Sequence, residues 1–378
     1  MNFTFTEEQI AARDLMRDFA QNEVKPIAEE LDKTGRFPAE IFAKLAELGL
    51  MGLNIPEEYG GAGLDEIAKI LCIEEIAKCC SNCSEVYAVQ MLVNDIINRN
   101  GTEEQKKKYL GMACEGKIGA FALTEPSAGS DANGVKTKAV KDGDDYILNG
   151  TKCFISNMGP GEGDYAIIIA ITDPATGEKT AFLVDRETPG FSIGKVEDKM
   201  GMRAAAVSEL VMVDCRVSKD QILGKIGGGL KVALGGLDGG RVGISAQSLG
   251  ICEACLDAAV EYSKQRVQFG KPVCKNQGLQ WYMAEMATRI EAARGLVYMA
   301  ACARMNGDKD SSMRCSMAKY YASETAKFVA DRALQIHGGY GYMKDYAIER
   351  LYRDARILSI YEGTSEVQKM VIAKAVMK

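Results

Sequence analysis

The chain has 378 residues, of which 47% are apolar and 26% are charged, and its formal net charge at pH 7 is −6. This length predicts two or three domains, and the composition is typical of a globular protein rather than a disordered one. The acidic balance, with no basic block, argues against nucleic acid as a partner.

The first residues show no charged stretch followed by an apolar one, so the sequence predicts no signal peptide. The longest apolar run, residues 166–171, is too short to span a bilayer. We therefore expect a cytoplasmic protein without membrane insertion.

Twelve cysteines are many for such a chain, and Cys79, Cys80 and Cys83 include a C-x-x-C spacing. A zinc site would need a second pair of ligands, whereas the one histidine of the sequence is His337. We expect no metal and read the cysteines as packing residues, whose number favours a reducing cytoplasm. The role of residues 79–83 stays open.

The first third of the chain reads as helical. Residues 6–9 and 102–105 are Thr-Glu-Glu-Gln, a capping-box pattern that marks the start of a helix. Apolar spacing predicts further helices over residues 67–77 and 86–98.

The middle of the chain changes to short β-type runs separated by turn residues. The runs cover residues 120–123, 146–148, 153–155, 165–172, 181–184 and 210–213. No helical pattern lies between them, which favours an antiparallel sheet or barrel.

Helix returns after about residue 229, in three long proline-free stretches over residues 232–266, 279–305 and 313–336. Helices of this length usually pack as a bundle. The sequence contains neither a P-loop nor a Gly-x-Gly-x-x-Gly after a strand, so a nucleotide cofactor would not be held in the doubly wound manner.

Two segments of the β-rich region could approach a flat ring. Residues 123–131 leave a strand and enter a loop of small and hydroxyl residues, which is either a binding loop or a plain surface turn. Phe154 and Ser156 share one strand face, where they could stack on a ring and hydrogen-bond to it; the alternative for Phe154 is a core position.

Two further segments carry charge. Arg266, at a basic and aromatic helix end, either clamps a pyrophosphate or is simply solvated. Glu362 stands between Tyr361 and Gly363 just before a short C-terminal helix, and by itself one glutamate among many acids indicates nothing.

Together, Thr-Glu-Pro at 124–126 with Gly-Ser-Asp at 129–131, Gln-Arg-Val-Gln-Phe-Gly at 265–270, Gly-Gly-Tyr-Gly at 338–341 and Tyr-Glu-Gly-Thr at 361–364 resemble the acyl-CoA dehydrogenase family over the whole chain. The nearest likeness is to the short-chain, butyryl-CoA branch, including bacterial enoyl-CoA reductases. The resemblance implies an α+β fold with an N-terminal helical domain (1–116), a middle antiparallel β-domain (117–226) and a C-terminal four-helix bundle (227–378). It also implies a homotetramer, FAD between the last two domains, and electron-transferring flavoprotein as the electron partner.

The resemblance assigns roles residue by residue. Residues expected to contact FAD are Phe121, Leu123, Thr124, Phe154, Ser156, Arg266, Gln268, Gln335, Gly338, Gly339, Thr364 and Glu366. Five of these residues match positions that reach the flavin of a neighbouring subunit: Arg266, Gln268, Gln335, Gly338 and Gly339. Residues expected to contact the CoA substrate are Ser130, Asp238, Arg241 and Gly363.

Glu362 matches the catalytic base of the family. The implied reaction removes a proton from Cα of an acyl-CoA thioester and transfers a hydride between Cβ and flavin N5, or runs in reverse on a 2-enoyl-CoA. In some branches the base lies on another helix, at the position of Gly240, which cannot act as a base.

The acyl group is less defined. Tyr87, Gln90 and Met91 lie where the acyl-pocket helix is expected, and they either reshape the pocket for a short or compact acyl group or pack elsewhere. The alternatives on the same scaffold are an aromatic enoyl-CoA reductase, an acyl-CoA oxidase and a non-catalytic paralogue.

Overall fold

The structure is a computed structural model and describes residues 4–377. Met1, Asn2 and Phe3, part of the segment in which no signal peptide is expected, lie outside this range. No helix in the described range is long and apolar enough to cross a membrane.

The first third is helical, as the sequence predicts. Its helices are α1 (Glu7–Phe19), α2 (Ala28–Thr34), α3 (Ala39–Glu47), α4 (Glu66–Cys79), α5 (Ser81–Asn100) and α6 (Glu103–Cys114). Both predicted capping boxes form: the hydroxyls of Thr6 and Thr102 accept hydrogen bonds from the backbone N–H groups of Gln9 and Gln105. The glutamine side chains accept from the cap N–H groups in return, which fixes where α1 and α6 begin.

The middle of the chain forms one sheet. Its strands are β1 (Gly119–Ala122), β2 (Lys138–Asp142), β3 (Asp145–Ser156), β4 (Tyr165–Asp173), β5 (Glu178–Asp185), β6 (Phe191–Val196), β7 (Val207–Ser218) and β8 (Ile222–Leu223). The order is β6-β7-β3-β2-β4-β5-β8, with β1 also paired to β4. Most neighbouring strands pair in antiparallel fashion, as expected, but β4 pairs in parallel with both β1 and β2.

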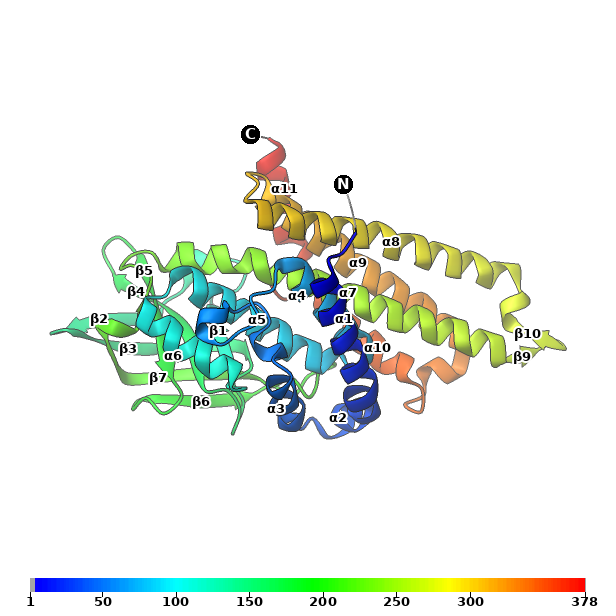
Figure 1. Cartoon of the computed structure of the whole chain (residues 1–378), viewed down its shortest axis with the longest axis horizontal. Helices are drawn as coiled ribbons and strands as arrows, with labels where there is room; N and C mark the ends of the chain where they lie inside the picture. The colour runs from blue at the N-terminus through cyan, green and yellow to red at the C-terminus, as the bar shows by residue number, and fades with distance from the viewer. Residues whose placement is uncertain (1–3, 378) are drawn as a thin grey trace.

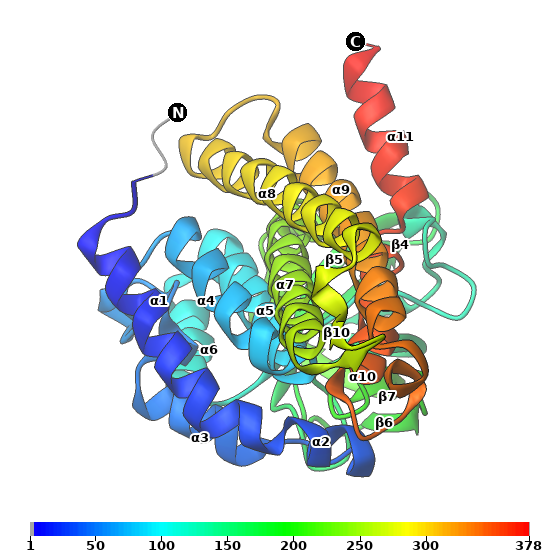
Figure 2. The same cartoon turned by 90° about the vertical axis from the view of Figure 1, so that its right-hand side faces the viewer.

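Three long helices dominate the C-terminal part: α7 (Gly229–Gln265), α8 (Gln277–Asn306) and α9 (Ser311–His337). The short strands β9 (Val267–Gln268) and β10 (Lys271–Pro272) join α7 to α8, and α10 (Ala347–Ala355) and α11 (Ser365–Val376) complete the bundle. Figure 1 shows the sheet at one end of the molecule and the β9–β10 hairpin at the other, with α7 running between them. In the view along the bundle, α1 to α6 lie on one side of α7 and α8 to α10 on the other (Figure 2).

Glycines let α7 approach the N-terminal helices closely. A Cβ atom on Gly250 would lie 2.3 Å from the carbonyl oxygen of Glu74 in α4, and one on Gly236 would lie 2.5 Å from Ile96 in α5. At Gly250 the close atom is backbone, so only glycine fits there, whereas a side chain at position 236 would force Ile96 to move. This contact places α5 beside the part of α7 that faces the C-terminal segment 361–363.

Candidate active site

Glu362 stands in a tight left-handed turn between α10 and α11. Its φ is +52° and that of Gly363 is +89°, and the first value is uncommon for a residue with a side chain. The Gly363 carbonyl oxygen accepts hydrogen bonds from Lys319 Nζ at 2.7 Å and from Gln368 Nε2 at 2.9 Å. These bonds hold the strained turn, as is common at functional sites.

The carboxylate of Glu362 faces α7. A Cβ atom on Gly240 would lie 2.7 Å from Glu362 Oε2, so the absent side chain at position 240 leaves the space in which this carboxylate lies. Oε2 is buried and has no hydrogen-bond partner among the described residues. A buried carboxylate oxygen without a partner is costly and marks a position that a ligand can complete.

Burial raises the pKa of Glu362 above its usual range, and the charges of Arg241 and Lys319 oppose that rise. Burial also lowers the pKa of Lys319 to about 8, while the charge of Glu362 acts to raise it. A carboxylate whose pKa is shifted toward neutrality is suited to exchange a proton with a substrate.

Arg241 and Asp238 lie one turn apart on α7. Arg241 Nη1 forms an ion pair with Asp238 Oδ1 at 2.7 Å, and the arginine Nε is buried without a partner among the described residues. The structure thus brings two predicted substrate-binding residues together, and the charge of Arg241 acts on Glu362. It leaves one donor of the guanidinium free for a ligand.

Tyr361 anchors the turn to the helices. Its hydroxyl donates to Gln247 Oε1 on α7, and Gln247 Nε2 donates in turn to Ser84 Oγ on α5 at 2.8 Å. This chain of hydrogen bonds ties the segment that carries Glu362 to both helices. No sequence pattern indicates Gln247, because an isolated glutamine in a long helix is not distinctive.

The predicted loop after β1 docks on β3. The carbonyl oxygen of Thr124 accepts from the Cys153 N–H at 3.0 Å. The fully buried Lys152 forms an ion pair with Glu125 at 2.8 Å and donates to the carbonyl oxygen of Leu123 at 3.1 Å. Thr124 is thereby held next to the end of β3.

Phe154 occupies an unusual position on β3. Its φ is +56°, its side chain is 65% exposed, and the pairing of β3 with β7 shifts register between Lys152 and Ile155. The bulge turns an aromatic ring outward on a sheet that is otherwise well packed. The alternative that Phe154 belongs to the core is wrong.

Ser156 has a partner that the sequence did not reveal. Its hydroxyl donates to Glu85 Oε1 on α5 at 2.8 Å, and Glu85 is only 3% exposed. Burial raises the pKa of Glu85 to about 7, and the charge of Glu362 contributes to the rise. A second buried carboxyl group therefore lies within electrostatic reach of Glu362. In the sequence, the one indication of Glu85 is that a glutamate stands among apolar residues of α5.

The three other residues of α5 that were considered for the acyl pocket belong to the scaffold. Tyr87 is buried and donates to the Leu50 carbonyl oxygen at 2.9 Å. Gln90 accepts from the Gly119 N–H at 2.7 Å and so joins α5 to β1, and Met91 lies in the main hydrophobic core. Their contacts agree with the interpretation that these three side chains pack elsewhere, rather than with the one in which they reshape the acyl pocket.

A second group of predicted residues lies at the other end of the bundle. Gln268 follows α7 in β9, Gln335 lies in the last turn of α9, and Gly338 and Gly339 begin the 3-10 helix after it; all four are exposed. The guanidinium of Arg266 lies 5.2 Å from the centre of the Tyr340 ring. Glu362 faces Gly240 on α7, whereas Arg266 follows the end of this helix, roughly 40 Å further along it at 1.5 Å per residue, so one chain does not bring this group to Glu362.

The remaining predicted residues lie around the first group. Thr364 caps α11 by accepting from the Val367 N–H at 3.3 Å, and Glu366 is exposed in the first turn of that helix. Phe121 is half-buried in β1, Leu123 is buried, and Ser130 is exposed in the loop that follows.

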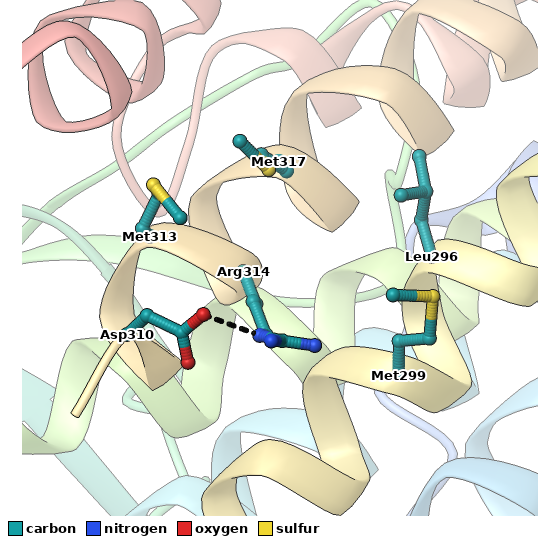
Figure 3. Close-up of a pocket in the computed structure, with 6 residues that line it drawn as sticks. All are labelled: Leu296, Met299, Asp310, Met313, Arg314 and Met317. Carbon is teal, nitrogen blue, oxygen red and sulfur yellow. Dashed lines mark hydrogen bonds and ion pairs between the residues drawn. The ribbon is translucent and has the colours of Figure 1, made fainter. Parts of the chain in front are cut away.

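A shallow pocket lies apart from this site. Figure 3 shows it between α8 and α9, with Met299 and Met317 on its two sides and Arg314 paired to Asp310. Its lining includes no predicted site residue, so it adds nothing to the chemistry around Glu362.

Comparison with known proteins agrees with this arrangement. Models of the acyl-CoA dehydrogenase N-terminal, middle and C-terminal domains match residues 6–117, 120–215 and 227–377. The acryloyl-CoA reductase (NADH) of Anaerotignum propionicum is 49% identical over 383 residues, which cover 100% of this chain and 96% of that protein. The caffeyl-CoA reductase–Etf complex subunit CarC of Acetobacterium woodii is 45% identical over 380 residues, 99% of each chain.

A solved structure is equally similar. Butyryl-CoA dehydrogenase from Megasphaera elsdenii superimposes with a TM-score of 0.97 at 45% identity over 100% of both chains. The chain belongs to the acyl-CoA dehydrogenase family, an enzyme family. The resemblance inferred from the motifs and the three-part fold are confirmed.

Proposed function

We propose that this enzyme catalyses the FAD-dependent α,β-dehydrogenation of a short or compact acyl-CoA thioester, or the reverse reduction of the 2-enoyl-CoA. The observation that carries the proposal is the buried Glu362 carboxylate, which lies in the space left by Gly240 and keeps one oxygen unpaired. The reaction needs a base at Cα, and this carboxylate has the burial and the raised pKa that suit one.

The residues around β3 fit a flat aromatic cofactor. The exposed Phe154 ring offers a stacking surface, and the hydroxyls of Thr124 and Ser156 lie on the adjoining chain segments. FAD, when bound, would accept the hydride from Cβ in dehydrogenation or return it in reduction. We propose that it is held between the middle domain, residues 117–226, and the C-terminal domain, residues 227–378, with residues 1–116 as the N-terminal domain.

The exposed group at the far end of the bundle suggests a site shared between subunits. Arg266, Gln268, Gln335, Gly338 and Gly339 lie far from Glu362 in one chain, so we propose that they reach the FAD of a neighbouring copy in a homotetramer. An arginine and backbone N–H groups of glycines suit the pyrophosphate of such a cofactor.

The chemistry at Glu362 works in both directions. As a carboxylate it takes the α-proton, while the positive charges of Arg241 and Lys319 limit how far its pKa rises. In enoyl reduction the protonated carboxyl group returns that proton to Cα. Closure of the site around substrate would exclude water and strengthen both roles.

Relatives suggest the substrates and the electron partner. One relative is named an acryloyl-CoA reductase, one a subunit of a caffeyl-CoA reductase–Etf complex, and one a butyryl-CoA dehydrogenase. We propose a cytoplasmic enzyme that exchanges electrons with an electron-transferring flavoprotein. An aromatic enoyl-CoA reductase is the second candidate, which the caffeyl-CoA relative favours.

The test is a panel of acyl-CoA and enoyl-CoA thioesters added to the purified protein. We expect a yellow protein whose flavin absorbance bleaches anaerobically with short acyl-CoA thioesters. A folded protein that takes up no FAD, or whose flavin no thioester reduces, would refute the proposal. Rapid reoxidation of the reduced flavin by O₂ would identify an oxidase instead.

A further inference from the structure

Glu85 is a buried acid without a counter-charge. Three other acids with little exposure form ion pairs, Glu74 with Arg294, Glu125 with Lys152 and Asp95 with Lys69, whereas the buried Asp354 forms none among the described residues. No cation lies within ion-pair distance of Glu85 among the described residues, although the residue is only 3% exposed. A buried carboxylate that lacks a cation is costly, so a role other than stability is expected.

The contacts of Glu85 leave half of its carboxyl group unused. Oε1 accepts from the Ser156 hydroxyl at 2.8 Å. Oε2 makes no hydrogen bond within residues 4–377. Since a carboxylate can accept several hydrogen bonds, this group has acceptor capacity that the protein does not fill.

The charges around Glu85 come from three neighbouring segments. Burial raises its pKa to about 7; the Ser156 hydrogen bond and the charge of Lys199 oppose the rise, and the charges of Asp354 and Glu362 add to it. Lys199 itself is partly buried, and burial lowers its pKa. Three carboxyl groups, those of Glu85, Asp354 and Glu362, thus lie within electrostatic reach of one another, and the charge of Lys199 acts on Glu85 without an ion pair.

We propose that Glu85 determines substrate specificity by binding a short acyl group that carries a positive charge at its distal end. The inference rests on the proposed function, in which Glu362 meets Cα and the Ser156 hydroxyl lies at the cofactor that would take the hydride from Cβ. An acyl chain that continues past Cα and Cβ then reaches the carboxyl group bonded to Ser156.

A cation fits this place better than a neutral group. An alkyl group would bury Glu85 further without any compensation, and a hydroxyl would supply a hydrogen bond but leave two carboxylates unopposed. A cationic substituent offsets the charge of Glu85 and reduces its repulsion of the ionised Glu362. The ligand would supply the ion-pair partner that Glu85 lacks among the described residues.

Two thioesters of the same shape test the idea. In 4-(trimethylammonio)butyryl-CoA the quaternary centre that carries the three methyl groups is N⁺, and in 5,5-dimethylhexanoyl-CoA it is carbon. We expect the protein to favour the cationic thioester in kcat/KM by about tenfold or more at pH 8, because opposite charges attract strongly away from bulk water. Glu85→Gln keeps an acceptor for Ser156 but removes the charge, and it should abolish the preference while the neutral thioester still reacts.

Glu74→Gln is the matched control, because Glu74 is also buried, its pKa is also raised to about 7, and it belongs to a different ion-pair network. We expect it to keep the preference for the cationic thioester. A parent enzyme without that preference, or a Glu85→Gln variant that retains it, would overturn the proposal.

The parent enzyme alone gives a second test if Glu85→Gln does not fold. The preference for the cationic thioester should decline as pH falls below about 7 and Glu85 becomes protonated; a ratio that stays constant from pH 8 to pH 6 would contradict the idea. The proposed function is tested separately with butyryl-CoA. If butyryl-CoA and the neutral isostere reduce the flavin but the cationic one does not, only the inference about Glu85 fails.

Discussion

Replacing Gly240 by alanine should displace the catalytic carboxylate without removing it. The new Cβ atom would lie 2.7 Å from Glu362 Oε2 and 3.1 Å from its Cδ, whereas ordinary contacts begin at 3.4 Å. The carboxylate must therefore move by about 0.7 Å or change rotamer, because a contact that short is strongly repulsive. A misplacement of about 1 Å at a reacting group can cost about 100-fold in rate.

We expect Gly240→Ala to reduce the anaerobic rate of flavin bleaching by about 10- to 100-fold. The matched control is Gly235→Ala on the same helix, where a Cβ atom would meet nothing within 4 Å. That change should leave the rate unaltered and stabilise the fold by about 0.5–1 kcal/mol, since alanine suits a helix better than glycine. If Gly240→Ala bleaches at the parent rate while thermal unfolding and FAD content match the control, the carboxylate does not work from this position.

Three further predictions concern the shared cofactor and the base. Arg266→Ala should weaken FAD retention, measured by the fluorescence of flavin released on dilution. Lys264→Ala removes an exposed cation at the same helix end and should leave FAD retention unchanged. Equal retention in both variants would show that Arg266 does not belong to the cofactor site. The bleaching rate should rise with pH through the raised pKa of Glu362, since only the carboxylate accepts the α-proton, so an acid limb near the ordinary glutamate value of 4.5 would contradict the burial argument. Gly240→Glu on the Glu362→Gln background should recover part of the lost activity, because a side chain at position 240 projects into the space in which the Glu362 carboxylate lies. A double variant as slow as Glu362→Gln alone would show that a carboxylate on residue 240 cannot replace that of Glu362.

Much of the fold could be predicted from local sequence. The capping boxes at Thr6 and Thr102 mark helix starts through bonds between residues three apart, and the long helices α7 to α9 lack proline. The strands β2 and β6 were missed, because their residues are mostly exposed and show no apolar run. The parallel pairing of β1 with β4 depends on contacts between residues about 46 positions apart, which no local pattern reports.

The site was predicted unevenly for similar reasons. Glu362 and the loop at Thr124 belong to motifs whose spacing is visible in the chain. Glu85 and Gln247 act through partners on other elements, Ser156 and Tyr361, and their relevance emerges only when α5, α7 and the C-terminal turn are packed together.

The central claim is that Glu362 removes the α-proton. Anaerobic stopped-flow measurement of flavin bleaching by a good acyl-CoA substrate, with the parent enzyme and Glu362→Gln side by side, tests it most directly. The amide is nearly isosteric but accepts no proton at neutral pH, so we expect the rate to fall by at least about 10²–10⁴-fold with FAD content and substrate binding preserved. A Glu362→Gln variant that bleaches within about tenfold of the parent rate, far less than the usual effect of losing a general base, would show that Glu362 is not the base.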